Sequence, residues 1–143
     1  MTALPLETAR TIIAAARAHA REAGLQPLTV VVLDAGGHVL AAEREDGASN
    51  RRFDIAFGKA HGAISMGLGS RALMARAENQ PYFVAAVTSA VGGALIPVPG
   101  GVLVRDAEGA LIGAVGITGD SSDNDEAAAV AAIEKAGLTA QTE

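Results

Sequence analysis

The sequence predicts an α/β fold of the α+β type, in which an antiparallel sheet has helices packed on it. Residues 28–45 and 102–118 each resemble a β-hairpin, because an apolar run meets an Asp-Ala-X-Gly turn and a second apolar run follows. Apolar residues with helical spacing flank both hairpins. Since the strands come in adjacent pairs, they are expected to be antiparallel neighbours, with the helices covering the sheet.

Each element has its own signal in the chain. Pro5 suits the first position of the first helix, and Gly24 suits its C-terminal stop. The first strand is apolar on both faces apart from Thr29, so it is expected at the centre of the sheet. The helices are expected at residues 6–24, 52–67, 70–78, 81–90 and 123–136. The strands are expected at residues 28–34, 38–45, 102–106 and 110–118.

The bulk composition excludes several classes of function. The chain has 143 residues, which suits one domain spanning residues 1–143. Its net charge of −5 leaves no electrostatic footprint for nucleic acid. The absence of cysteine excludes disulfides and thiol catalysis. No apolar run is long enough to cross a membrane and the N-terminus does not resemble a signal peptide, so a cytoplasmic protein is expected.

Four acidic residues, Asp120, Asp123, Asp125 and Glu126, follow the second hairpin. An EF-hand loop needs ligands at fixed positions with Gly at the sixth, and neither possible register meets this requirement. Asp123 as the N-cap would place Glu126 at the third helical position, which is the spacing of a capping box. The stretch is therefore interpreted as a helix N-terminus and not as a calcium site.

Several motifs together resemble the GlcG/HbpS-like family, which includes the PduO C-terminal domain. They are "VVVLDAGGHVLAAEREDGAS", "DIAFGKAHGA", "GGALIPV" and "GALIGAVGITG" leading to "DNDEAAAVAAI", in this order. The resemblance covers nearly the whole chain. It implies an antiparallel sheet of about five strands and assembly into homo-oligomers, often octamers. It also implies haem binding in some members and roles in small-molecule catabolism in others.

Haem as a cofactor would need an axial ligand and an apolar slot. His19, near the end of the first helix, is the preferred ligand, because a histidine in this helix resembles the haem ligand of PduO-type domains. His61, His38, Met66 and Met74 remain alternatives.

Arg44 and Asp46 would project to one face at the end of the second strand. The Arg44 guanidinium suits a carboxylate, either a haem propionate or a small acidic substrate. Lys59 is expected opposite the apolar face of its helix, either solvated or paired across a subunit interface with Asp46 or Asp125. The alternative function is therefore an acid/base enzyme (an isomerase, hydratase or lyase) that uses Arg44, Asp46 and Lys59 on a small polar metabolite. A purely structural oligomer is a third possibility.

Self-association is also expected. Small residues such as Ile112, Ala114 and Gly116 line one side of the last predicted strand and look insufficient to fill a monomeric core. The chain is therefore expected to form a homo-oligomer larger than a dimer, and the resemblance implies an octamer.

Overall fold

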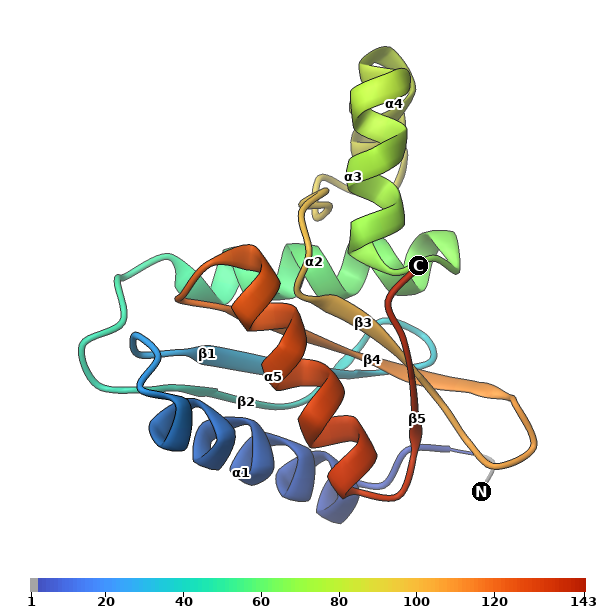
Figure 1. Cartoon of the computed structure of the whole chain (residues 1–143). Helices are drawn as coiled ribbons and strands as arrows, with labels where there is room; N and C mark the ends of the chain where they lie inside the picture. Colours follow the sequence, from blue (N-terminus) through green and yellow to red (C-terminus); the bar gives the residue numbers. More distant parts are fainter. Residues whose placement is uncertain (1–2) are drawn as a thin grey trace.

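The structure, a computed structural model, describes residues 3–143, so the first two residues of the expected domain lie outside it. Its element order matches the predicted order, with one added strand at the C-terminus (Figure 1). The helices are α1 (Leu6–Ala23), α2 (Arg52–Met66), α3 (Ser70–Asn79), α4 (Pro81–Ala90) and α5 (Ser122–Lys135). The strands are β1 (Thr29–Asp34), β2 (Val39–Arg44), β3 (Gly101–Arg105), β4 (Leu111–Thr118) and β5 (Thr139–Gln141).

The two hairpins share one antiparallel sheet, as predicted. The order is β2-β1-β4-β3-β5, so β1 has a neighbour on each side and its expected central place is confirmed. Both turns use the same chemistry. Asp34 Oδ1 accepts hydrogen bonds from the Gly36 and His38 N–H groups, and Asp106 Oδ1 accepts from the corresponding groups of Glu108 and Ala110. Turn chemistry therefore accounts for the likeness of the two hairpin sequences.

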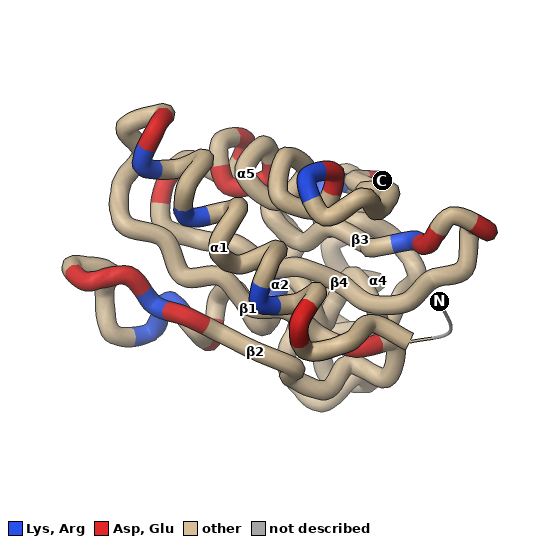
Figure 2. The backbone as a smooth tube through the Cα atoms, turned by 90° about the horizontal axis from the view of Figure 1, so that it is seen from below, with Lys and Arg blue, Asp and Glu red and all other residues tan. Residues whose placement is uncertain are grey.

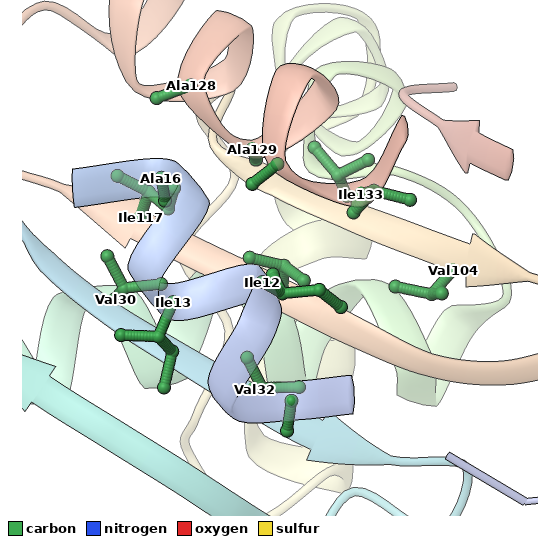
Figure 3. Packing of buried hydrophobic residues seen from close by; sticks show 14 of the residues in the cluster. Ile12, Ile13, Ala16, Val30, Val32, Val104, Ile117, Ala128, Ala129 and Ile133 are labelled. Atoms are coloured by element: carbon green, nitrogen blue, oxygen red, sulfur yellow. The ribbon is translucent and has the colours of Figure 1, made fainter. Parts of the chain in front are cut away.

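Two layers of helices cover the sheet. α1 and α5 lie on one face, where Ile12 and Ile13 pack against Val30 and Ile117 (Figure 3). α2 covers the other face and packs on Val31, Leu33, Leu103 and Ala114. The alanines of α1 and α5 keep these two helices close together over the sheet, which forms the groove described below.

Ile112, Ala114 and Gly116 of β4 were expected to be too small to fill the core of a monomer. The structure corrects this expectation, because all three are buried within one chain. Ile112 and Ala114 are buried within one chain. Gly116 lies directly under α2, and a Cβ there would stand 2.0 Å from the Ala56 carbonyl oxygen. Ala114 and Gly116 allow α2 to pack closely on the sheet, whereas Ile112 packs in the core on the opposite face, with α1 and α5.

α3 and α4 form an arm that projects from the sheet (Figure 1). Val84 of α4 packs with Leu73 of α3 and Leu95 in a small cluster apart from the main core. Val84 is the one buried residue of α4, and Tyr82 is 71% exposed. The arm therefore presents an apolar helix to solvent.

Candidate functional site

The expected haem ligand, His19, lies in a groove between α1 and α5. Its lining residues on α1 are spaced so that they share one face of the helix. The groove has a volume of about 300 Å³ and is lined by Ala15, Ala18, His19, Glu22, Ala131 and Lys135. A second hollow of about 310 Å³ adjoins it and is lined by His19, Glu22 and Ala23. His19 therefore lies where the two hollows meet.

The residues of this His19 groove fit a planar ligand that binds through an imidazole. His19 is half-buried and forms no side-chain hydrogen bond within residues 3–143. Its ring nitrogens are thus not committed to another protein group. Ala15, Ala18 and Ala131 give the groove a low apolar floor that a flat macrocycle can approach. These groups supply the axial ligand and one wall of the apolar slot that haem needs, so the donor set fits haem.

The other expected ligands have different surroundings. His61 Nδ1 lies 2.9 Å from the Ala94 carbonyl oxygen, and the His61 ring stacks on Phe57. His38 is exposed and pairs with Asp34 in the first turn. Met66 packs against the cluster in the α3–α4 arm. Within residues 3–143, His61 thus keeps only Nε2 free of hydrogen bonds and Met66 is packed against the arm, whereas His19 keeps both ring nitrogens free.

A hollow of about 500 Å³ lies near His61, between α2 and the loop that follows α4. Ile55, Phe57 and Ile96 give it apolar walls, and Asp54 lies at its rim. The hydrogen bond with Ala94 places Nδ1 of His61 on the loop that forms one of these walls. Because Nδ1 is already in this bond, His61 has no free nitrogen on that side for a ligand in the hollow.

Arg44 and Asp46 are both exposed at the end of β2, where acidic and basic residues alternate (Figure 2). No ion pair joins them within the described part of the chain. The residue between them, Glu45, is buried and accepts a hydrogen bond from the Leu28 N–H at 2.8 Å. Glu45 was not among the predicted site residues, although its alternation with Arg44 and Asp46 along the strand places it on the opposite face.

The Glu45 carboxylate holds α1 against β2. Arg17 Nε and Arg21 Nη2 of α1 each lie 3.3 Å from it. Arg17 also pairs with Glu43 at 2.7 Å. Arg17, Arg21, Glu45 and Asp46 border a hollow of about 210 Å³ together with Pro27. Both guanidiniums are therefore already paired with carboxylates, and the cluster fixes the position of α1.

Lys59 is buried, which corrects its expected place on the exposed face of α2. Its side chain is 2% exposed, and Nζ lies 2.9 Å from the Ile117 carbonyl oxygen and 3.2 Å from Asp125 Oδ2. The Lys59–Asp125 pair forms within one chain and not across a subunit interface. It joins α2, on one face of the sheet, to the start of α5, on the other face.

Glycine makes room for the buried lysine. A Cβ at Gly100 would stand 2.9 Å from Lys59 Nζ, and one at Gly101 would stand 2.2 Å from the Lys59 carbonyl oxygen. The helical spacing of α2 contains no sign of these distant glycines, so periodicity alone placed Lys59 on the wrong face.

Burial shifts the pKa values of both members of this pair. It lowers the pKa of Lys59, and the nearby Asp125 carboxylate opposes the shift. It raises the pKa of Asp125, again with partial compensation from its partner. No hydrogen bond or ion pair joins Lys59 to Arg44 or Asp46 among the described residues. The three residues named for the alternative enzyme do not form one site within the chain.

The acidic residues at the start of α5 are bound by other groups of the protein. The N-cap of α5 is Ser121, whose hydroxyl accepts from the Asn124 N–H, so the prediction of Asp123 as the cap is wrong. Asp123 and Glu126 both pair with Arg71 of α3. Asp120 Oδ1 accepts from the Gln26 N–H at 2.8 Å. Within residues 3–143, no group of three or more His, Cys, Asp or Glu residues is arranged to hold a metal ion.

Comparisons with known proteins agree on the relatives of this chain. The family model described as "Haem degrading protein HbpS-like" matches residues 4–134. The crystal structure of PduOC in complex with haem is similar, with 27% identity, 99% of each chain covered and a TM-score of 0.83. Klebsiella pneumoniae protein ORFY has 27% identity over 96% of this chain and 92% of its own, with a TM-score of 0.85.

A double mutant of Streptomyces reticuli HbpS has 30% identity, covering 94% of this chain and 88% of its own, with a TM-score of 0.80. No curated protein matches the sequence. In the described part of the chain, no helix is both long and apolar enough to cross a membrane.

Proposed function

The chain belongs to the HbpS-like family of haem-degrading proteins, and from this premise we propose that it binds haem through His19 as a homo-oligomer. The His19 groove is the observation that carries the proposal. It combines an imidazole that forms no hydrogen bond with the described residues and an apolar floor between two helices. The similar PduOC structure, which covers 99% of this chain, is a haem complex. That relative supports the same class of ligand here.

The chain's own residues would hold the group as follows. The His19 imidazole would offer a nitrogen lone pair to ferric iron. The floor of Ala15, Ala18 and Ala131 would cover part of the macrocycle and exclude water from it. When bound, haem supplies an iron centre for ligand exchange and electron transfer. Arg44 lines neither hollow at His19, so a propionate contact from Arg44 would come from a neighbouring subunit.

The homo-oligomer is supported by α4. This helix has no charged side chain, exposes Tyr82, and rests on α3 with Val84 alone fully covered. Helices that are apolar all round are normally buried, and exposed apolar patches mark contact surfaces. We propose that α4 packs against other copies of the chain, and the family suggests an octamer.

A hemin titration followed at the Soret band tests this function. Wild type is expected to bind hemin, and His19→Ala is expected to lose or shift the band. His38→Ala is the matched control, because His38 is 80% exposed and lies in a turn outside the His19 groove. Size-exclusion chromatography checks that each variant keeps the assembly. Equal, weak hemin binding by wild type and His19→Ala would contradict the proposal.

A further inference from the structure

The His19 groove carries one charged side chain of each sign. Glu22 comes from α1 and lines both hollows, whereas Lys135 comes from α5 and lines the His19 groove alone. Lys135 lies in the last turn of α5, where the helix dipole stabilises a cation. The groove is therefore electrostatically uneven, with its positive charge on the α5 side.

The three arginines of α1 are already paired with carboxylates. Arg17 and Arg21 hold Glu45, and Arg10 lies 3.3 Å from Glu7. Lys135 is exposed and forms no ion pair within residues 3–143. Among the described residues that line the His19 groove and its adjoining hollow, it is the one cation, so it is available for a negatively charged ligand group.

We propose that Lys135 binds a carboxylate of the ligand in the His19 groove and thereby sets the orientation of that ligand. The inference rests on the proposed haem function, because haem carries two propionates on the edge of an apolar ring. With the iron at His19 and the ring on the alanine floor, a propionate on the α5 side would meet the Lys135 ammonium. A propionate in the adjoining hollow would meet the Glu22 carboxylate, which repels it. Lys135 and Glu22 together favour one orientation.

The test compares hemin with hemin dimethyl ester, whose esterified propionates carry no charge. Lys135→Met is expected to weaken hemin binding by roughly threefold to tenfold, because a partly exposed charge pair is lost. It is expected to leave the affinity for the dimethyl ester unchanged. Lys135→Arg should keep hemin affinity, and Glu22→Gln should raise it. Arg10→Met, which removes an exposed cation far along α1, is the matched control.

Two further readouts separate a charge contact from a change in structure. The Soret wavelength of hemin-bound Lys135→Met should equal that of wild type, because the iron ligand is unchanged. Raising the salt concentration should weaken hemin binding to wild type more than to Lys135→Met, because ions screen exposed charges.

The outcomes distinguish this inference from the proposed function. If His19→Ala abolishes hemin binding but Lys135→Met binds hemin as wild type does, the Lys135 inference is wrong and the haem function stands. If Lys135→Met weakens hemin and its dimethyl ester equally, its effect is structural and the inference is again wrong. If wild type does not bind hemin, both proposals fail.

Discussion

Lys59 and Asp125 carry opposite charges inside the protein, and each depends on the other. Burial lowers the pKa of Lys59 and raises the pKa of Asp125, so desolvation outweighs the attraction between them. The pair joins α2 to α5, and its formation requires both charges to be desolvated. Removing one partner leaves the other charge buried with its backbone hydrogen bond but without an opposite charge, whereas removing both charges avoids that penalty.

Denaturation tests how strongly Lys59 and Asp125 depend on each other. Lys59→Met and Asp125→Asn are each expected to lower the free energy of unfolding by about 3–5 kcal/mol. The double mutant is expected to recover most of the loss, and urea denaturation measures all three. Arg10→Met, which removes an exposed ion pair, serves as a control and should change stability by less than about 1 kcal/mol. Additive losses in the double mutant would contradict the account.

Asp120 is expected to make the stability of the protein depend on pH in the acid range. Hydrogen bonds from the Gln26 backbone N–H, the Asn124 side chain and the Ser121 backbone N–H lower the pKa of its carboxyl. Because the folded-state pKa is depressed, Asp120 stabilises the protein above the ordinary carboxyl pKa. That contribution is lost as the pH falls through the lowered value. Asp120→Asn should therefore flatten the acid limb of a plot of melting temperature against pH. An unchanged acid limb would show that this carboxylate does not contribute.

At the scale of the element, the start of α5 shows how a cap is chosen. Ser121 and Asp123 both have side chains that can cap a helix, and the chain uses Ser121 because Asp123 turns toward Arg71 of α3. Ser121→Ala is expected to lower the free energy of unfolding by about 1 kcal/mol through the lost cap. Asp123→Ala should cost less, since its side chain is 78% exposed and contributes only to a surface ion pair. A larger loss for Asp123→Ala, measured by thermal or urea denaturation, would restore it as the cap.

Periodicity and turn chemistry identified most of the secondary structure. α4 spans the predicted residues, and the Asp-Ala-X-Gly turns at Asp34 and Asp106 fixed both hairpins. β5 was missed because its three residues are too short to show an alternating pattern. The elements that could be predicted are those whose signal lies within a few residues of the chain.

The candidate site was less predictable, because it depends on contacts between distant segments. His19 could be named because its helix resembles the helix that carries the haem ligand in PduO-type domains. Its neighbour Lys135 could not, since the two share a groove only when α5 packs on α1. Likewise, the burial of Lys59 depends on Gly100 and Gly101, which lie more than 40 residues further along the sequence.

For the whole molecule, assembly is expected to depend on α4. Ala86 is exposed in the middle of this uncharged helix, so Ala86→Glu should place buried charges in a subunit interface without disturbing the fold of one chain. Light scattering should then show a smaller particle than for wild type. Ala107→Glu, in the exposed β3–β4 turn, is the control and should leave the particle size unchanged. A monomeric wild type at micromolar concentration would contradict the proposed oligomer.

The proposal that His19 binds the haem iron is tested most directly by identifying the iron ligand. Resonance Raman spectra of the ferrous haem complex report the iron–imidazole stretching vibration. We expect this band in wild type and in His61→Ala. In His19→Ala we expect the band to be lost while the oligomeric state stays unchanged. Persistence of the same band in His19→Ala would show that another residue binds the iron and would contradict the account.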